Sequence, residues 1–452
     1  MYKYEWVVQD LQSKLIQGTW KEGQNLPSIR QLSDTYQCSK STIIRAYAEL
    51  ERQHLIYAIP QSGYYVVKQE KQNTKSNVQT INFSSTTPDP ALFPYRDFQH
   101  CLNQAIDRYK NDLFTYGTPQ GLPSLIKVLQ QQLANHQIFA STKQIVVTSG
   151  VQQALSVLTT MSFPNKKHMV LVEQPSYHLF LRMLQLRKVS TLGIERTADG
   201  LDLNQLEYLF RTKPIKFFYT MPRFHNPLGT SLAQKEKKTL ANLAKRYQVY
   251  IVEDDYLMDL EGNAKADPIF SYQNEYLIYL KSFSKILFPG LRVGVVILPN
   301  KLISDFIHYK RTHDIDSSML SQASLEIYIQ NGMYQYHRQK IRTAYQLRMQ
   351  KLHELLTSLP IEDYISYPSI QTGAHTHLTI DQPISLEKLQ KKLATQHIIV
   401  GNIRENYFEN HPHKNIVRLN VSNVHESNME KGVTTVLKEV KHISNLYRRQ
   451  FF

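Results

Sequence analysis

Two different hydrophobic patterns run along the chain and divide it near residue 80. In residues 3–18 apolar side chains recur every three or four positions, which is the spacing of one face of a helix. Beyond Thr80 short, nearly continuous apolar runs alternate with stretches of helical spacing. The first pattern predicts a small helical domain. The second predicts an α/β domain whose mainly parallel sheet is covered on both faces.

The small domain continues with two more helices and a pair of strands. Ser28 and Ser39 are candidate N-caps of two helices, which we expect to end near Tyr36 and Gln53. Two short apolar strands follow, separated by the turn sequence Pro-Gln-Ser-Gly. This order of elements predicts a winged helix-turn-helix, and the alternative is a small packing domain with ordinary polar surfaces.

Short hydroxyls and cations gather at the start of the second of these helices. A helix N-terminus attracts phosphate groups, and such side chains also suit base edges. The residues are Lys40, Ser41, Thr42 and Arg45.

Residues 68–80 contain a single apolar residue, Val78. Such a segment cannot bury enough surface to offset its ordering entropy, so we expect a flexible linker. A polar surface loop is the alternative, and a domain boundary lies here in either case.

Chemically useful side chains follow the apolar runs of the second part, where the predicted strands end. Ligands of parallel sheets gather beyond the carboxyl ends of the strands, so we expect these side chains to share one edge. After about residue 316 the pattern becomes helical and then mixed, which predicts a smaller α+β domain. The expected segments are residues 1–67, the linker 68–80, a large domain at 81–315 and a small domain at 316–452.

Composition narrows the class of protein. Hydrophobic residues make up 42% and charged residues 20% of the 452, an ordinary globular balance. We find no apolar run of about 18 residues, no signal peptide and no metal-ligand cluster, and only two cysteines. A reduced, cytoplasmic setting without a metal is therefore expected. The net charge of +15 indicates a polyanionic partner, with a general solubility charge as the alternative.

Lys285 stands just beyond a buried strand and follows two small hydroxyl residues, Ser282 and Ser284. A lone lysine is usually a solvated charge. At the end of a buried strand, however, desolvation lowers its pKa and frees the amine to attack an aldehyde.

Other strand ends supply partners for such an aldehyde. Backbone N–H groups at a helix start form a phosphate site, a carboxylate holds a ring N–H, a tyrosine stacks on a ring, and amide or phenol donors hold a phenolate. These features together describe pyridoxal 5′-phosphate (PLP), although each alone has an ordinary structural alternative. The candidates are Gly150, Val151 and Gln152 with Ser282, Ser284 and Arg292 for the phosphate, Asp254 for the ring nitrogen, Tyr177 for stacking, and Asn226 and Tyr256 for the phenolate.

The front stretch resembles the DNA-binding domain of the GntR family of bacterial regulators. The matching motifs are LPSIRQLS, CSKSTIIRAYAELE and SGYYV, and one departure is Ile44, where many members carry arginine. The resemblance implies DNA contacts from Arg30, Ser39, Lys40, Ser41, Thr42, Arg45 and Gly63.

Residues from about 81 to 445 resemble fold-type I aminotransferases. The motifs are YGTPQG, TSGVQQA, EQPSY, HNPLG, EDDY, SFSKILFPGLRVG and VRLNVS. The resemblance implies that Lys285 forms the Schiff base with PLP, that Arg418 holds a substrate or effector carboxylate, and that Tyr116 reaches the phosphate in the neighbouring subunit. Leu228 and Leu179 depart from family patterns, and Leu179 disfavours GABA as the effector.

The two resemblances together indicate the MocR subfamily of GntR regulators. This implies a homodimeric, PLP-responsive regulator that binds double-stranded operator DNA and takes an amino-acid-like effector. An active aminotransferase with a DNA-binding domain is the alternative, so whether the chain is an enzyme stays open. A cofactor-free dimerisation scaffold is a third reading.

Overall fold

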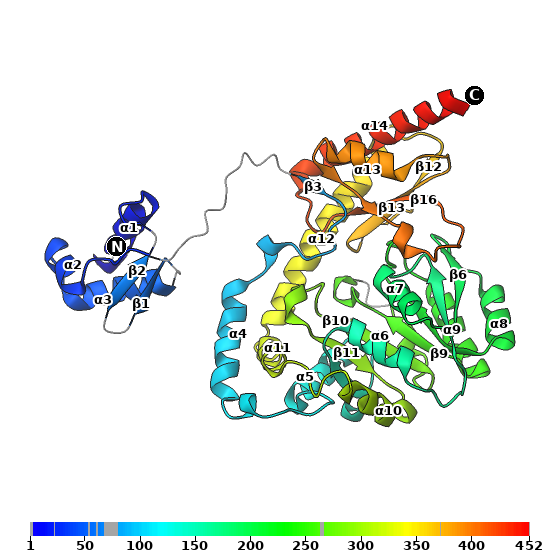
Figure 1. Ribbon diagram of the computed structural model, residues 1–452, viewed down its shortest axis with the longest axis horizontal. Coiled ribbons are helices and arrows are strands. Elements are labelled where there is room, and N and C mark those ends of the chain that lie inside the picture. Colours follow the sequence, from blue (N-terminus) through cyan, green and yellow to red (C-terminus); the bar gives the residue numbers. More distant parts are fainter. Residues whose placement is uncertain are drawn as a thin grey trace. The chain divides into compact units, whose positions relative to one another are not determined.

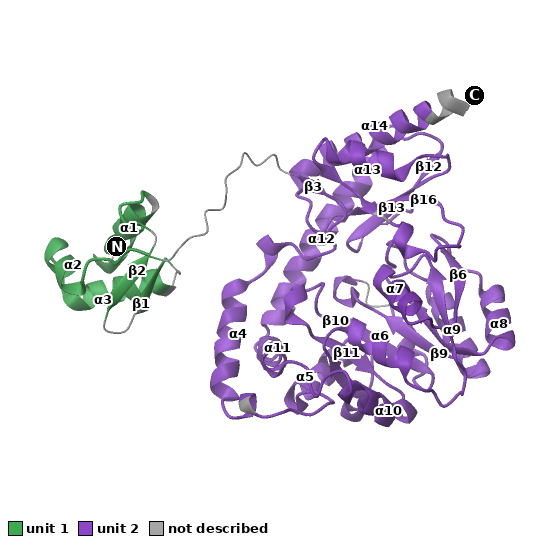
Figure 2. Cartoon of the chain, in the orientation of Figure 1, with its two compact units in different colours: residues 1–78 green, residues 79–452 purple. Residues whose placement is uncertain are grey.

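The computed structural model of the chain contains two compact units, residues 1–78 and 79–452 (Figure 2). It describes residues 3–21, 23–52, 55–59, 62–66, 80–262, 266–370 and 372–451. The predicted linker, residues 68–80, lies outside the described residues except for its last one.

The first unit is a winged helix-turn-helix, as predicted (Figure 1). Strands β1 and β2 pair antiparallel with Ile56 opposite Val66. The elements are α1 (Lys3–Ile16), α2 (Ile29–Thr35), α3 (Lys40–Arg52), β1 (Ile56–Ile59) and β2 (Gly63–Val66).

Helix caps and a small apolar core hold this unit together. Ser28 and Gln31 form a capping box at the start of α2, in which each side chain accepts from the other's backbone N–H. Val7 of α1 packs with Ile43 and Leu50 of α3, and all three side chains are fully buried. The helical spacing seen in the sequence therefore places one face of α1 and one of α3 in a common core.

The second unit is built on an eight-stranded mixed sheet. Its order is β4-β11-β10-β9-β8-β5-β6-β7; β5, β6, β8, β9 and β10 run parallel, whereas β11 is antiparallel to both β10 and β4. The strands are β4 (Ile145–Thr148), β5 (Met169–Gln174), β6 (Thr191–Thr197), β7 (Gly200–Leu201), β8 (Ile215–Thr220), β9 (Tyr250–Asp254), β10 (Leu277–Ser282) and β11 (Gly294–Ile297).

Helices cover both faces of this sheet, which explains the continuous apolar runs of its strands. Alternate residues point to opposite faces, so Ile145 and Val147 join one core cluster while Val146 joins another. The helices are α4 (Tyr95–Arg108), α5 (Pro123–Ala134), α6 (Val151–Thr160), α7 (His178–Leu186), α8 (Leu203–Thr212), α9 (Gln234–Tyr247), α10 (Asn300–Arg311) and α11 (Met319–Gln330).

A second, antiparallel sheet lies in the C-terminal part of the same unit. Its order is β12-β13-β16-β15, and β14 pairs separately and in parallel with β3. The strands are β3 (Ile81–Asn82), β12 (Ile365–Ser366), β13 (His375–Ile380), β14 (Ile398–Ile399), β15 (Gly401–Asn402) and β16 (Asn415–Asn420), with helices α12 (Met333–Ser358), α13 (Leu386–Ala394) and α14 (Glu426–Phe451).

We expected the boundary between the large and the small domain at residues 315 and 316. Two stretches pack with the part of the second unit to which this boundary does not assign them. Ile81 and Phe83 pack in the core of the C-terminal sheet, because β3 pairs with β14. Helix α11 packs on α4 and α5, and its Leu325 and Tyr328 belong to a core cluster of the large sheet. A single boundary in the sequence therefore does not separate the residues that pack on the two sheets.

Within the described residues we find no helix both long and apolar enough to cross a bilayer.

Substitution of Leu50 by Ala tests the first unit's core. We expect the free energy of unfolding to fall by about 2–5 kcal/mol, because the fully buried side chain leaves a cavity. Ile44→Ala on the same helix is the control, and because Ile44 is 49% exposed its loss should stay near about 0.5 kcal/mol. Both tryptophans of the chain, Trp6 and Trp20, lie in this unit, so urea titration followed by tryptophan fluorescence reports on it alone. Equal losses of unfolding free energy in the two variants would contradict the placement of Leu50 in the core.

Candidate functional site

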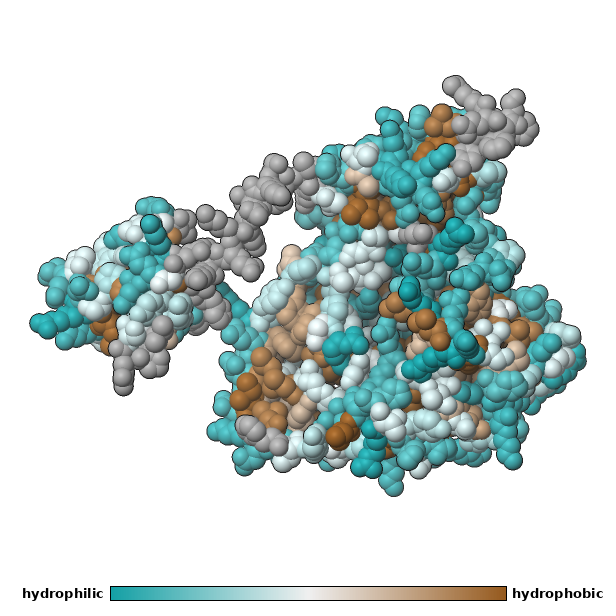
Figure 3. Space-filling model, viewed as in Figure 1, coloured by the Kyte–Doolittle hydropathy of each residue, from teal (hydrophilic) through white to brown (hydrophobic). Residues whose placement is uncertain are grey.

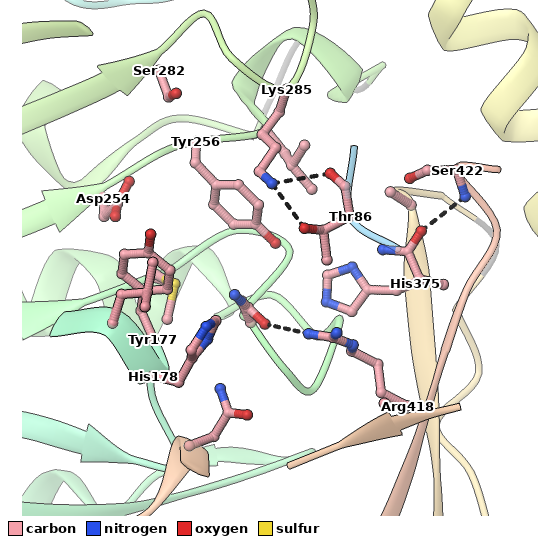
Figure 4. A pocket seen from close by; sticks show the side chains of 18 of the residues that line it. Thr86, Tyr177, His178, Asp254, Tyr256, Ser282, Lys285, His375, Arg418 and Ser422 are labelled. Atoms are coloured by element: carbon pink, nitrogen blue, oxygen red, sulfur yellow. Dashed lines mark hydrogen bonds between the residues drawn. The ribbon is translucent and has the colours of Figure 1, made fainter. Parts of the chain in front are cut away.

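A cavity of about 520 Å³ lies where the parallel strands of the large sheet end (Figure 4). Side chains from both parts of the second unit line it. The predicted site residues among its lining are Val151, Tyr177, Asn226, Asp254, Tyr256, Ser282, Lys285 and Arg418.

Lys285 lies three residues beyond β10, with its amine directed into this cavity. Its Nζ donates to the backbone oxygen of Thr86 at 3.0 Å and to Thr86 Oγ1 at 2.9 Å. Burial lowers the pKa of Lys285 to about 8, and the positive charge of Arg418 acts in the same direction. About a tenth of the amine is therefore uncharged at pH 7.

Asp254 ends β9 beneath the same cavity and is 4% exposed. Tyr219 donates its hydroxyl to Asp254 Oδ2 at 2.7 Å, whereas Oδ1 has no hydrogen-bond partner among the described residues. Burial raises the pKa of Asp254 to about 7, against the lowering effect of the Tyr219 hydrogen bond. A buried carboxylate with one unused oxygen suits a buried cationic N–H donor.

The turn between β4 and α6 brings backbone N–H groups to the cavity edge. Gly150, the residue before α6, has φ +92°, which other residues rarely adopt. A Cβ on Gly150 would lie 2.9 Å from Arg292 Nη2, and a Cβ on Gly294 would lie 2.8 Å from the Gly150 carbonyl carbon. Close backbone packing therefore shapes this turn. We call the turn at Gly150 and Val151 the anion cradle, because it is the predicted phosphate site.

The remaining predicted phosphate contacts lie around this turn. Arg292 donates from Nη2 to Ser149 O at 2.9 Å, and the Ser284 N–H donates to Ser282 Oγ at 3.2 Å. Gln152 lies in the first turn of α6 and donates to the Tyr177 hydroxyl at 3.0 Å. Ser282 and Val151 face the cavity.

The two tyrosines and the asparagine that we predicted to surround a ring all line the cavity. Burial raises the pKa of both Tyr177 and Tyr256, so both phenols stay protonated. Tyr256 donates to the Phe224 carbonyl oxygen at 2.8 Å. Asn226 Oδ1 accepts from Arg418 Nη1 at 3.1 Å.

Arg418 of β16 reaches the cavity from the C-terminal sheet. Its Nη2 donates to the Ser84 carbonyl oxygen at 3.0 Å, while Nε has no partner among the described residues. Tyr116 is 78% exposed and lies outside the cavity lining, so its expected role toward a neighbouring subunit stays a prediction.

Sequence reasoning missed several lining residues, among them Ser84 and Thr86. Both lie in the irregular segment between β3 and α4, about 200 residues before Lys285 in the sequence. No periodicity or motif marks them, because their position depends on the pairing of β3 with β14. His178 and His375, which also line the cavity, were likewise not singled out.

The predicted DNA-contacting residues lie on the surface of the first unit. Ser39 Oγ accepts from the Thr42 N–H at 3.2 Å and so caps α3. The Arg45 guanidinium lies over the Tyr4 ring, 4.1 Å from its centroid. Thr42 is half-buried, and the exposed members of the set are Arg30, Ser39, Lys40, Ser41, Arg45 and Gly63.

Comparison with known families assigns both units. Residues 79–436 match the family described as aminotransferase class I and II, and residues 3–66 match the bacterial regulatory proteins of the gntR family. The fold and the site thus define a regulator with a DNA-binding helix-turn-helix and an aminotransferase-type domain. The chain belongs to the aminotransferase class I and II family and, through its first unit, to the gntR family, which is the arrangement of MocR-type regulators.

Similar full-length proteins are regulators. The HTH-type transcriptional regulator YcxD of Bacillus subtilis (strain 168) is 48% identical, with 97% of this chain and 100% of the relative covered. The HTH-type transcriptional regulator YdcR of Escherichia coli (strain K12) is 28% identical, with 89% and 91% covered.

Solved structures resemble the second unit. The Pyrococcus horikoshii kynurenine aminotransferase, solved in complex with PMP, has a TM-score of 0.74 at 25% identity; 81% of this chain and 92% of that chain are covered. LysN, an α-aminoadipate aminotransferase from Thermus thermophilus, has a TM-score of 0.74 at 22% identity, with 81% and 93% covered.

Gly294→Ala tests the close packing beneath the anion cradle. A Cβ at residue 294 would lie within 2.9 Å of three backbone atoms of Gly150 and Val151. We expect a loss of about 1–3 kcal/mol in the free energy of unfolding. Gly290→Ala is the control, because its Cβ would meet only the Phe288 ring at 3.5 Å. Chemical denaturation followed by circular dichroism measures both, and a Gly294→Ala variant as stable as Gly290→Ala would contradict this packing.

Proposed function

We propose that the chain is a PLP-responsive transcription regulator whose aminotransferase-type domain senses a ligand and whose winged helix-turn-helix binds operator DNA. The observation that carries this proposal is the presence, in one chain, of a gntR-family DNA-binding unit and a cavity with the donors and acceptors that PLP requires. Regulators similar along nearly the whole chain support it.

The residues present fit PLP. Asp254 Oδ1 is an unused buried acceptor for the pyridine N–H, and the Gly150–Val151 turn, which a side chain would obstruct, offers N–H groups to the phosphate. Tyr177 offers a ring face, and Asn226 and Tyr256 lie where they can hold the phenolate. PLP, when bound, supplies an aldehyde that a lysine amine captures.

Two side chains of the cavity, Lys285 and Arg418, are suited to bind the aldehyde and an effector. Burial keeps a fraction of the Lys285 amine uncharged, and only the uncharged amine is a nucleophile. Arg418, which points into the same cavity with its Nε unpartnered among the described residues, offers a bidentate site for the carboxylate of an amino-acid-like effector.

DNA binding falls to the first unit. The exposed N-terminal turn of α3 presents Ser39, Lys40 and Ser41, while Gly63 begins the second strand of the wing. Helices of this kind enter the major groove of double-stranded DNA. The net charge of +15 adds a sequence-independent attraction to phosphates.

A homodimer would complete the site and set the spacing of two operator half-sites. Tyr116, 78% exposed in one chain, is available to a neighbouring subunit's phosphate group. Hydrophobic surface gathers beside α4 (Figure 3), where Ile106 is 44% exposed, and a second copy would cover it.

A regulator of this class acts in the cytoplasm, where it meets the chromosome.

An active aminotransferase is a second candidate, because Lys285, Asp254 and Arg418 share one cavity. Complete conversion of bound PLP to pyridoxamine phosphate, recycled by a keto acid, would favour it. Binding of an amino compound without turnover would favour the sensor.

A gel shift on the DNA upstream of the protein's own gene tests the regulator directly. We expect PLP to change the apparent affinity of the wild-type protein by about fivefold or more, because a ligand that prefers one arrangement shifts the equilibrium between arrangements. Lys285→Ala should show no PLP effect, whereas the surface variant Lys301→Ala should behave as wild type. Identical affinities with and without PLP in the wild type would reject the switch.

The pH dependence of PLP capture tests the lowered pKa of Lys285. Because only the uncharged amine reacts, the capture rate should rise about tenfold per pH unit below pH 8 and level off above it. An ordinary lysine would let the rate rise to about pH 10. Stopped-flow absorbance gives the rates, and free lysine under the same conditions corrects for the titration of PLP itself. A continuous rise to about pH 10 would refute the shift.

A further inference from the structure

The segment between β3 and α4 crosses the ligand cavity and touches both of its key cations. Thr86 accepts two hydrogen bonds from the Lys285 amine, at its backbone oxygen and at Oγ1. The Ser84 carbonyl oxygen accepts from Arg418 Nη2 at 3.0 Å. Figure 4 shows Thr86 and Arg418 facing the cavity from the side opposite Asp254. We call residues 84–87 the strap.

Covalent capture of an aldehyde cannot leave the Lys285–Thr86 contact intact. The uncharged amine carries two hydrogens, one for each of the two Thr86 oxygens that lie within hydrogen-bond distance. When the nitrogen bonds to the aldehyde carbon, the aldehyde oxygen leaves as water and the nitrogen keeps at most one hydrogen. At least one of the two hydrogen bonds to Thr86 must therefore break.

The strap is tied to the strand at which the second unit begins. Asn82 Oδ1 in β3 accepts from the Ser84 N–H at 2.9 Å, from Ser84 Oγ at 2.7 Å and from the Ser85 N–H at 3.1 Å. On the other side, Asn423 Nδ2 donates to Ser85 Oγ at 3.1 Å and to the Thr87 carbonyl oxygen at 2.6 Å. The strap therefore cannot shift without straining a continuous set of hydrogen bonds to β3.

Strand β3 lies between the strap and the start of the second unit. It is two residues long and pairs with β14 at Ile81 and Asn82, and the next residue, Phe83, is fully buried. The chain before it leads, within residues 67–79, to the DNA-binding unit. Asn82, which holds Ser84 and Ser85, therefore lies between the strap and the start of that connection.

We propose that Thr86 is a positioning residue that holds the Lys285 amine in the unloaded protein, and that the release of this amine on PLP capture is transmitted through the strap and Asn82 to the connection with the DNA-binding unit. The inference rests on the proposed function, since it assigns the contact through which that function is regulated. It makes the strap a two-state element that ligand occupancy biases.

Thr86→Val in the full-length protein tests the proposed role of Thr86 in positioning the Lys285 amine. Valine has nearly the shape of threonine but lacks the hydroxyl acceptor, so the unloaded state loses one hydrogen bond that loading would otherwise break. We expect PLP to bind about three- to tenfold more tightly, as measured by absorbance titration. Thr86→Ser should restore the wild-type dissociation constant. Thr212→Val, which removes an exposed hydroxyl on α8 outside the cavity lining, should leave it unchanged.

Asn82→Ala tests the proposed transmission from the strap through Asn82 to the DNA-binding unit. Asn82 lies outside the cavity lining, so PLP affinity should stay within about twofold of wild type, while the PLP-dependent change in DNA affinity should fall by about half or more. If Thr86→Val fails to fold, as judged by thermal unfolding, Thr86→Ala replaces it.

The outcomes separate this inference from the proposed function. A wild-type protein that neither binds PLP nor changes its DNA affinity would refute the proposed function. A wild-type protein that does both, with unchanged or weaker PLP binding in Thr86→Val, would overturn the role of Thr86 alone. An undiminished DNA response in Asn82→Ala would overturn the transmission route.

Discussion

The site depends on one constraint: the Lys285 amine is placed, half-buried, in the cavity at the carboxyl edge of the large sheet. Burial lowers its pKa to about 8, so a chemically ordinary side chain becomes a nucleophile near neutral pH. The same low-polarity surroundings raise the pKa of Asp254 to about 7 and keep Tyr256 protonated. Asp254 Oδ1 has no hydrogen-bond partner among the described residues. A cofactor with a ring N–H, a phenolate and an aldehyde offers a partner to each of the three groups.

Backbone packing makes this arrangement possible. The antiparallel strand β11 lies between β4 and β10, and its first residue, Gly294, lets the Gly150 turn approach closely enough to form the anion cradle. The C-terminal sheet then brings Arg418 across the cavity, where Asn226 and Ser84 hold it. The strap precedes the large sheet in sequence and follows β3, which pairs with β14. It connects the cavity to the chain that leads to the DNA-binding unit.

The sequence predicted much of this because several of its signals are local. Caps at Ser28 and Ser39, followed by two short strands around a Pro-Gln-Ser-Gly turn, predicted the winged helix-turn-helix, and the apolar runs placed Asp254 and Lys285 at strand ends. Arg418 was found only through a family resemblance, since a lone strand arginine carries no signal. The pairing of β3 with β14 and the contact of Thr86 with Lys285 join residues far apart in the chain. Such contacts depend on the assembled fold, and a single sequence does not contain them as a pattern.

The most direct test of the account is borohydride reduction of the purified protein after incubation with PLP, followed by peptide mass spectrometry. The account predicts one added pyridoxyl phosphate group per chain, on the peptide that contains Lys285, with the buried Lys281 unmodified because it is paired with Asp259. Protein that gains no mass at Lys285, or gains it equally at exposed surface lysines, would contradict the central claim.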